Sequence, residues 1–337
     1  MTEPGRDLPK DFPHVDIFIA PNQPERLVEF LKLGGVSSKE YALSRKIGES
    51  ITKYITIMHG CDNFCSYCVV PYVRGREFSR PMDEILEEIK QTDFNQYKEI
   101  FLLGQNVNSY KYGLADLLHK TEAFISHDTY PISRIRFMTS HPKDMVDDII
   151  NAVADLPHVC EYFHLPVQHG DDDMLKKMNR GYNLDYYRKL IAKIRAKIPG
   201  AAITSDVIIG YPGETDQQFA NTLKIIREIS FDACNTAAYS VRPGTAAAKL
   251  ADDVPDQVKQ QRLQQAMLVV DEVTQNNNNK LLGTVQEVLV DKKGTGRTRT
   301  NKIVKFTPNK SDLLGQLVNV KIATAKSWLL QGDLLNG

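Results

Sequence analysis

The sequence lacks the features of a membrane or secreted protein. None of its 337 residues belongs to an apolar run near the ~18 consecutive residues that a membrane-spanning helix needs. Residues 1–16, MTEPGRDLPKDFPHVD, have neither the basic nor the apolar region of a signal peptide. Charge of one sign is also missing, because Lys+Arg and Asp+Glu number 42 each, so net charge indicates no class of partner. We expect a cytoplasmic protein of about two domains.

Cysteine is scarce as well. The five cysteines are an odd number in a long chain, which argues against a disulfide framework. Cys160 and Cys234 lie among apolar residues of predicted strands and are expected to be buried core thiols. The other three, Cys61, Cys65 and Cys68, form a CxxxCxxC pattern, and this clustering predicts a metal site.

The presence of three clustered thiols without a fourth limits which kind of metal centre the loop can hold. A structural zinc site needs four ligands, and the chain offers no second CxxC pair. His59 adjoins Cys61 too closely in the chain to chelate well with it. An iron–sulfur cube takes one ligand per iron, so three cysteines leave one iron open. Such an open iron can bind a small chelating molecule and pass it an electron.

Short apolar runs alternate with longer amphipathic segments over most of the chain. Strands are predicted at 54–58, 99–104, 134–140, 161–167, 202–213 and 232–240, and helices at 82–91, 114–125, 144–156, 185–198 and 215–229. Six strands in succession with helices between them predict an α/β fold with a parallel sheet, open or curled into a TIM-like barrel. The cysteines and the segments GQNVNSY, TSHPKD, LPVQHG and IGYPGE each follow a strand, so they are expected to converge where such barrels carry their chemistry.

The C-terminal part has a different composition. Residues 251–279 predict a polar linker helix, and residues 280–337 alternate as in a small antiparallel barrel of about five strands. Ten Lys+Arg against four acids give 280–337 a net charge of +6. This predicts phosphate contacts with a nucleic acid, the alternative being a solvated lysine-rich surface. The candidate RNA-binding residues are Arg297, Arg299, Lys302 and Lys305 here, and Arg74, Arg76 and Arg80 beside the cysteines, where ion pairing with Glu77 is the alternative.

Several motifs together carry a family resemblance. CxxxCxxC with Tyr67 before the last cysteine resembles the signature of radical S-adenosylmethionine (SAM) enzymes. GCDNFCSYCVVPYVRGREFSRP, LLGQNVNSY, HLPVQHG, MNRGY, DVIIGYPGET and YSVRPGT resemble the methylthiotransferases, most closely the branch of tRNA 2-methylthio-N6-dimethylallyladenosine synthases. The resemblance runs from about residue 50 to the end. It implies a partial (β/α)6 radical SAM core over 49–250 and a TRAM-like RNA-binding barrel over 280–337.

The resemblance also implies a chemistry. Cys61, Cys65 and Cys68 would hold a 4Fe–4S cluster whose fourth iron takes the amino and carboxylate groups of SAM, and reductive cleavage would give a 5′-deoxyadenosyl radical. The backbone around Tyr67 would meet the adenine. The other implied cofactor-binding residues are Gly104, Gln105, Asn106, Ser140, Gln168, Asp206 and Glu214. For the polar residues among them, capping of a loop is the alternative.

The implied reaction adds a 2-methylthio group to N6-isopentenyladenosine at position 37 of tRNA. The expected partners are the tRNA anticodon stem–loop and an electron donor such as flavodoxin; we expect a monomer and no membrane. The alternatives are a tRNA-binding remnant without turnover, or a methylthiotransferase for threonylcarbamoyladenosine tRNA or a ribosomal protein.

Three departures from the family pattern stand out. Residues 1–48 resemble a remnant of an N-terminal domain that ordinarily carries three further cysteines for a second 4Fe–4S cluster, and they contain none. We therefore expect a shortened form with incomplete activity. Val241 replaces the usual acid, and His169 replaces a common serine. His169 is expected to be an ordinary loop residue.

Overall fold

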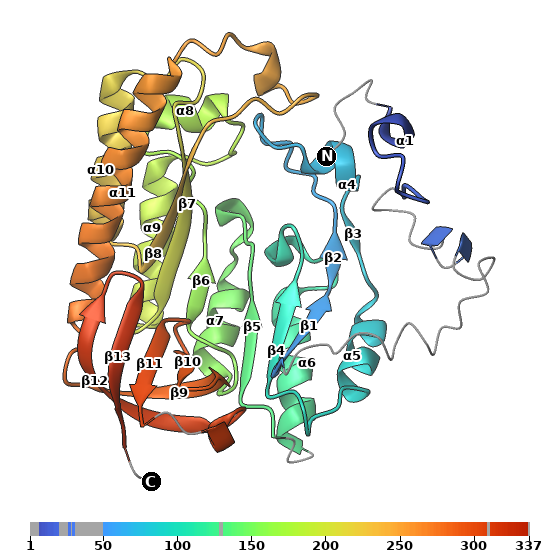
Figure 1. The fold of residues 1–337 in the computed structure, drawn as a ribbon, viewed down its shortest axis with the longest axis vertical. Coiled ribbons are helices and arrows are strands. Elements are labelled where there is room, and N and C mark those ends of the chain that lie inside the picture. Colours follow the sequence, from blue (N-terminus) through green and yellow to red (C-terminus); the bar gives the residue numbers. More distant parts are fainter. Residues whose placement is uncertain are drawn as a thin grey trace.

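The computed structural model describes residues 7–19, 26–27, 29–30, 50–127, 131–308 and 311–335 (Figure 1). The segment expected to be an N-terminal remnant lies largely outside these residues; its one helix with described bounds is α1, Leu8–Asp11. In the described part of the chain, no helix combines the length and the apolar character needed to cross a membrane.

Six parallel strands form the core of the chain, in two sheets of three. One sheet contains β1 (Thr52–Thr56), β4 (Glu99–Leu103) and β5 (Arg134–Phe137), and the other contains β6 (Tyr162–His164), β7 (Ala202–Ile209) and β8 (Ala233–Ala238). All pairings within both sheets are parallel. A single parallel bridge, from Ile135 to Val159, connects the two halves. The sheet is therefore a partial barrel, and its fold class is the one that the strand–helix alternation predicts.

Amphipathic helices cover the outer face of this sheet (Figure 1). They are α5 (Met82–Lys90), α6 (Leu114–His127), α7 (Asp147–Asp155), α9 (Leu184–Lys197) and α10 (Asp216–Ile229). Their apolar sides pack in one core with the outward side chains of the strands. Local chemistry fixes their ends: α10 begins with a capping box between Thr215 and Gln218 and ends at Ser230, which adopts a left-handed conformation.

Strand alternation separates this outer core from an inner face. Ile55, Ile100 and Leu102 are fully buried against the helices. Tyr54 and Phe101, each next in sequence to one of them, point to the other side of the sheet because successive side chains of a strand alternate. Side chains on the inner face of the barrel therefore do not pack against the helices and remain accessible to solvent.

Several short elements join the loops at the two ends of the sheet. They are β2 (Met58–His59), α4 (Val70–Arg74), β3 (Phe78–Ser79), η1 (Val107–Ser109), η2 (Pro142–Asp144), α8 (Asp172–Lys177), η3 (Ala247–Lys249) and η4 (Ser311–Leu313). No simple apolar period marks such short pieces, and the sequence did not predict them.

A long helix and a closed barrel complete the chain. The helix α11 (Asp256–Asn279) packs on α10 and β8. The barrel contains β9 (Val285–Lys292), β10 (Thr295–Thr298), β11 (Ile303–Thr307), β12 (Leu317–Lys326) and β13 (Leu329–Leu334), in the order β10-β11-β13-β12-β9. Four of its pairings are antiparallel, but β11 pairs with β13 in parallel, which corrects the expectation of an all-antiparallel barrel.

Two buried arginines fasten this barrel to the amino ends of the parallel strands. Arg134 begins β5 and donates to the backbone carbonyl of Arg297, while Arg136 donates to those of Thr298 and Arg299. The barrel therefore lies at the end of the sheet opposite the loop that carries the clustered cysteines (Figure 1). Any ligand that touches both must extend along the inner face.

Candidate functional site

The cysteine loop follows β1 and is closed by a short antiparallel pair, β2 with β3. A glycine makes this closure possible, since Gly60 has φ +74° and a Cβ there would lie 2.1 Å from the carbonyl oxygen of Arg76. A second glycine, Gly104, ends the neighbouring strand, and a Cβ there would lie 2.5 Å from Cγ of Met58. Both glycines let two loops approach more closely than any other residue would allow.

The three thiols of this loop share one environment. Cys65 is buried and Cys61 and Cys68 are half-buried, and burial raises the pKa of the Cys61 and Cys68 thiols. Charge on Cys65 raises these two pKa values further, so the three sulfurs lie within electrostatic reach of one another. Within the described ranges, no three His, Cys, Asp or Glu side chains gather around a single ion position. A 4Fe–4S cube needs three thiols that each bind a different iron, and the three thiols of this loop are compatible with that.

Arg180 anchors the loop from across the barrel. It is only 4% exposed, and its guanidinium donates to Sγ of Cys65 at 3.2 Å and to the Tyr67 hydroxyl at 3.3 Å. A further hydrogen bond to the carbonyl of Pro166, at 2.9 Å, fixes its position. Sequence reasoning did not select Arg180; its one signal was its place in the MNRGY segment. A buried cation at a thiolate favours the charged sulfur that an iron ligand needs.

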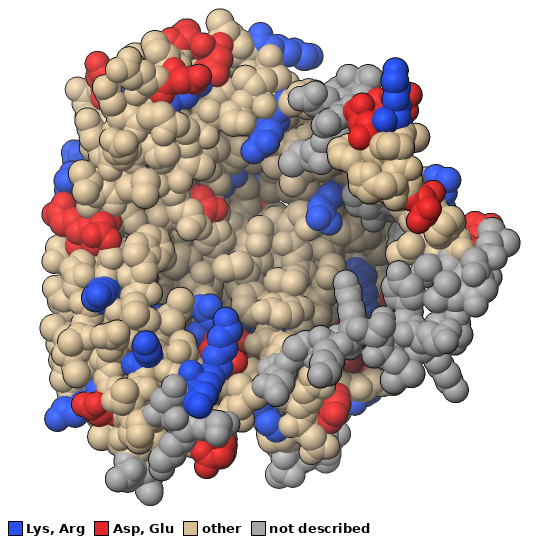
Figure 2. Space-filling view, viewed as in Figure 1, with Lys and Arg blue, Asp and Glu red and all other residues tan. Residues whose placement is uncertain are grey.

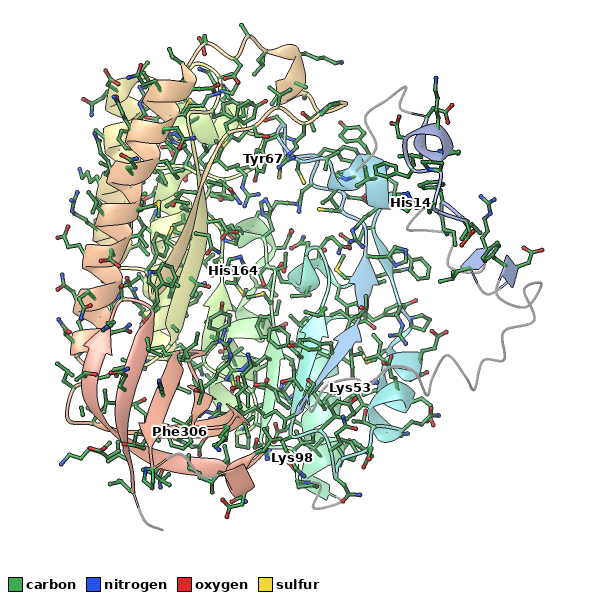
Figure 3. The ribbon with its side chains drawn as sticks, in the orientation of Figure 1. His14, Lys53, Tyr67, Lys98, His164 and Phe306 are labelled. Carbon is green, nitrogen blue, oxygen red and sulfur yellow. The ribbon has the colours of Figure 1, made fainter. Side chains whose placement is uncertain are left out.

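The tip of the loop bridges the two halves of the sheet. The backbone amide of Ser66 donates to the carbonyl of Met178 at 3.0 Å, and the carbonyl of Ser66 accepts from the amide of Ala247 at 2.7 Å. The Ser66 and Tyr211 hydroxyls are 2.8 Å apart. Figure 3 shows the adjacent Tyr67 between the two halves, and its burial raises the pKa of its phenol well above the usual range. The loop is thus held rigidly over the barrel opening.

Unpartnered polar atoms collect in the two loops that follow β4 and β5. Asn106 joins these loops: its Nδ2 donates to Asp144 at 2.7 Å, and its Oδ1 accepts from the amide of His141 at 2.9 Å. Beside it, Gln105 Oε1, Ser140 Oγ and His141 Nε2 are buried without a partner in the described structure. Buried polar atoms are nearly always paired. These loops are therefore suited to a polar ligand, as the sequence predicts for Gln105 and Ser140.

His141 presents a defined donor to this space. Its Nδ1 accepts from the amide of Lys143 at 3.2 Å, so the proton of a neutral ring lies on Nε2. Burial, together with the charges of Arg180 and Lys143, lowers the pKa of His141 to about 2. The ring therefore stays neutral and directs an N–H toward the site. Although TSHPKD was selected as a loop, this histidine was not.

The second half of the sheet carries a hydrogen-bonded ladder on its inner face. His164 (Figure 3) contacts the Thr204 hydroxyl at 3.0 Å and Asp206 at 3.2 Å, and Asn235 donates to Asp206 at 2.8 Å. These partners lower the pKa of Asp206 although burial opposes them. Gln168 lies next to Asp206, and its backbone amide donates to the backbone carbonyl of Asp206 at 2.9 Å. Asp206 and Gln168 thus lie together, where the sequence predicts part of the cofactor pocket.

Glu214, in contrast, does not face this pocket. Its carboxylate is fully buried, with Arg262 at 2.7 Å, His169 Nε2 at 3.0 Å and the amide of Gly210 at 2.9 Å. These contacts hold the loop after β7 against α11. In this structure Glu214 makes structural contacts, and its cofactor role stays a prediction. His169 is likewise a buried partner in this cluster and not the ordinary loop residue that we expected.

The arginines beside the cysteine loop differ in their accessibility. Arg76 is paired with Asp62 at 2.6 Å, and not with Glu77. Arg80 donates to the carbonyl of Thr56 at 2.7 Å and pairs with a glutamate of α5. Arg74 is exposed and has no hydrogen bond or ion pair with another described residue. Of the three, Arg74 is the one whose cation is free for a phosphate.

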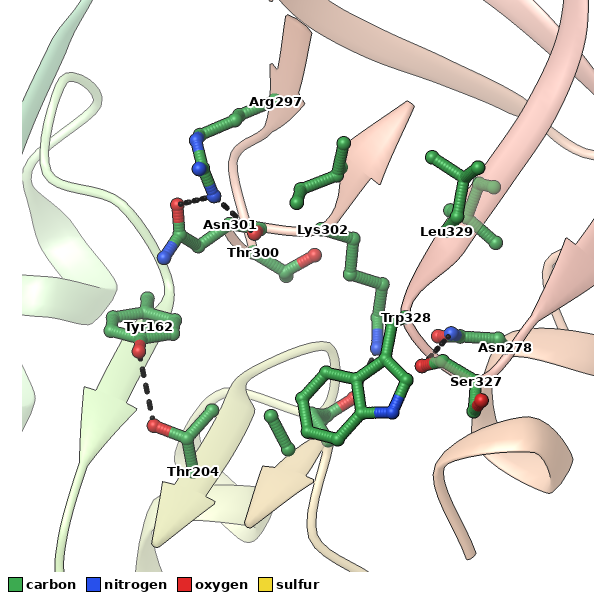
Figure 4. A pocket seen from close by; sticks show the side chains of 14 residues that line it. Tyr162, Thr204, Asn278, Arg297, Thr300, Asn301, Lys302, Ser327, Trp328 and Leu329 are labelled. Carbon is green, nitrogen blue, oxygen red and sulfur yellow. Dashed lines mark hydrogen bonds and ion pairs between the residues drawn. The ribbon is translucent and has the colours of Figure 1, made fainter. Parts of the chain in front are cut away.

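Two cations of the C-terminal barrel face the core domain. Arg299 pairs with Glu161 at 2.7 Å, and Lys302 pairs with Asp232 at 2.8 Å. Lys302 lines a small pocket between barrel and core, together with the lone tryptophan, Trp328 (Figure 4). Acids at the strand starts neutralise both cations, and their RNA contacts stay a prediction that these ion pairs do not support. Arg297 lies partly exposed beside an aspartate, and Lys305 is exposed on β11.

Comparisons with known proteins match two families to these two regions. The Radical SAM superfamily matches residues 55–226, and the TRAM domain matches residues 279–335. The chain is a radical SAM protein. Relatives named tRNA-2-methylthio-N(6)-dimethylallyladenosine synthase include one from Acetivibrio thermocellus, 45% identical over 332 residues, covering 96% of this chain and 68% of the relative. Another, from Clostridium botulinum, is 43% identical over 351 residues, and the match covers 97% of this chain and 77% of the relative. This radical SAM protein belongs to their family.

A solved structure supports the fold independently. The radical SAM methyltransferase TsrM from Kitasatospora setae superposes with a TM-score of 0.51 at 15% identity, covering 71% of this chain and 39% of that one. The superfamily uses a 4Fe–4S cluster and SAM, and the three thiols with Arg180 fit such a cluster. The family's methylthiotransferases imply a second cluster. Cys160 and Cys234 are each 2% exposed in the core and offer no second ligand set.

Proposed function

We propose that this radical SAM protein is a tRNA methylthiotransferase that adds a methylthio group to C2 of N6-dimethylallyladenosine beside the anticodon. The observation that carries the proposal is the cysteine loop, held by Arg180 over a sheet whose inner face stays accessible. The names of the relatives at 42–45% identity support this substrate, and the TRAM match supports an RNA partner.

Within this proposal, Cys61, Cys65 and Cys68 bind the cluster and leave its fourth iron for SAM. When bound, the cluster supplies the electron that cleaves the sulfonium of SAM reductively. Arg180 holds Cys65 and Tyr67 in place, and its charge offsets that of the thiolate ligands. A site that is fixed before its ligand arrives needs no reorganisation when the reaction begins.

The unpartnered polar atoms of the loops after β4 and β5 would orient SAM. Gln105 Oε1 could accept from the ammonium group of SAM, whereas the Ser140 hydroxyl and the His141 Nε2–H could donate to its carboxylate or ribose oxygens. His164 and Asp206 face the same interior from the opposite half of the sheet. They are placed to hydrogen-bond the adenine edge of a nucleoside that enters from the open side.

The experiment supplies the anaerobically reconstituted protein with SAM, a strong reductant and two anticodon stem–loop RNAs. One RNA carries N6-dimethylallyladenosine and the matched control carries threonylcarbamoyladenosine. We expect 5′-deoxyadenosine with the first RNA, and a methylthio nucleoside when a sulfide source is added, read by mass spectrometry. Conversion of the control RNA alone would contradict the proposed substrate. Formation of 5′-deoxyadenosine without any modified RNA would limit the activity to cleavage of SAM.

A further inference from the structure

The inner face of the first sheet carries an uncovered aromatic pair. Tyr54 is 58% exposed although it lies in the middle of β1. It pairs in register with Phe101 of β4, and the two rings lie 5.7 Å apart at an interplanar angle of 33°. Ile55, the next residue, is fully buried on the other face. The exposure of Tyr54 is therefore a property of the inner face and not of a frayed strand end.

A cleft of about 1130 Å³ runs over this pair. It begins at the amino ends of the strands, at Thr52 and Glu99, and reaches Leu103 and Met138 at their carboxyl ends. It thus leads from the attachment of the C-terminal barrel toward the loops that carry the cysteines and the unpartnered polar atoms. Figure 2 shows a hollow between the two halves of the molecule, with basic side chains along its lower rim.

The opposite wall of the cleft is the turn between β9 and β10. Lys292 ends β9 and Lys293 follows it in the turn, and both line the cleft. Both are exposed, and neither has an ion pair with another described residue. Arg299 and Lys302 are neutralised in the interdomain contact, and Arg297, which also lines the cleft, pairs with Asp291, so the two lysines are the cations of this wall without an ion pair to a described residue. The sequence showed a basic barrel, but it did not show which of its cations face the core.

We propose that Tyr54, Phe101, Lys292 and Lys293, here named the aromatic–lysine cleft, bind an unpaired RNA nucleotide. Its base stacks on the two rings, and its phosphate contacts the two lysines. An aromatic platform with cations at one edge is the usual arrangement for single-stranded RNA, whose unstacked bases have free faces. A duplex would not fit, because its bases are already stacked.

This inference rests on the proposed function and adds a second contact to it. The nucleotide in the cleft differs from the adenosine that is modified, because that adenosine must reach the cysteine loop at the other end of the strands. The cleft would hold the neighbouring loop nucleotides and so fix which base enters the barrel. Phosphate contacts position an RNA, whereas stacking selects its unpaired part.

The test measures binding of the cluster-loaded protein to a fluorescent anticodon stem–loop RNA by anisotropy at several salt concentrations. Loss of one stacked base makes Tyr54→Ala bind about 10-fold more weakly, whereas Tyr54→Phe keeps the ring and stays near the wild-type Kd. The double variant Lys292→Ala/Lys293→Ala lowers the slope of log K against log salt by roughly 1.4, the value for two single-strand phosphate contacts. Lys224→Ala, on the outer helix α10, is the matched control and changes neither.

The outcomes separate the two proposals. If the wild-type protein binds no anticodon stem–loop, the proposed function itself fails. If it binds and the Tyr54→Ala and double-lysine variants bind equally well, only the cleft is refuted. A second readout does not depend on affinity: RNA with 5-iodouridine in its loop should crosslink to the peptide that contains Tyr54. Crosslinks confined to other peptides, or tighter binding to an acidic peptide than to RNA, would also overturn the inference.

Discussion

Arg180 links the cluster ligands to the opposite half of the sheet through a single side chain. We expect Arg180→Met to lower the reduction potential of the reconstituted cluster, because hydrogen bonds and positive charge at the sulfurs raise that potential. The lost charge-assisted hydrogen bond corresponds to about 1.5–3 kcal/mol. Arg180→Lys should keep the charge and part of the effect. Potentiometric titration measures this; equal potentials for all three proteins would contradict the role of Arg180.

Gly60 allows a close backbone approach that positions Cys61. Gly60→Ala should lower the iron content sharply, because the new Cβ would overlap the carbonyl of Arg76 at 2.1 Å and displace the loop. Gly75 is a matched control: its φ is +80°, but a Cβ there meets nothing within 4 Å. Gly75→Ala therefore suffers the backbone strain of its φ +80°, ψ −171° conformation, about 1–3 kcal/mol, without the overlap. Equal iron content in the two variants would refute the steric explanation.

The buried His141 should make the fold sensitive to acid. Its pKa is lowered from 6.5 to about 2, so below pH 6.5 the unfolded chain takes up a proton that the folded chain refuses. Above pH 6.5 His141 is neutral in both states and does not lower the unfolding free energy. Below pH 6.5 the unfolding free energy falls as the pH falls. Between pH 7 and pH 5 the wild type should lose about 2 kcal/mol more unfolding free energy than His141→Gln. Anaerobic urea denaturation at both pH values measures this; parallel losses would contradict it.

At the scale of the element, the regular strands and helices and the parallel sheet of the core were predictable, whereas the strand pairing of the C-terminal barrel was not. The predicted strand 99–104 and helix 215–229 correspond within one residue to β4 and α10, because a long apolar period survives in the sequence. The parallel pairing of β11 with β13 leaves no local signal. The three cysteines were visible from spacing alone. The ion pair of Arg299 with Glu161 was not predictable, because the two residues lie far apart in the sequence.

The contact between barrel and core offers its own prediction. Arg136→Leu leaves Glu99 buried and unpaired and removes the donors of two barrel carbonyls, so the unfolding free energy should fall by about 3–5 kcal/mol. Arg227→Leu breaks an exposed pair with Glu272 and should cost only about 0–1 kcal/mol. Denaturation and protease cleavage of α11 would report the difference. Equal stability of the two variants would mean that Arg136 does not fasten the barrel.

At the scale of the molecule, the C-terminal barrel and the cysteine loop lie at opposite ends of the parallel strands, so the proposed function assigns RNA binding to one end and redox chemistry to the other. Arg136 fixes the barrel at the amino ends of the strands, and Arg180 fixes the cysteine loop at the carboxyl ends. The inner face, with Tyr54 on one half and His164 on the other, spans the distance between them. In the proposed function, an RNA loop bound to the barrel would reach the cysteine loop along this inner face.

Cys61, Cys65 and Cys68 are expected to hold a single redox cluster, on which the proposed function depends. The most direct test is the iron and sulfide content per chain after anaerobic reconstitution, compared with Cys65→Ala and with the core control Cys234→Ala. We expect about four irons and four sulfides per chain in the wild type and in Cys234→Ala, and the loss of both in Cys65→Ala. A wild type that binds no iron, or a Cys65→Ala variant that retains the full content, would contradict it.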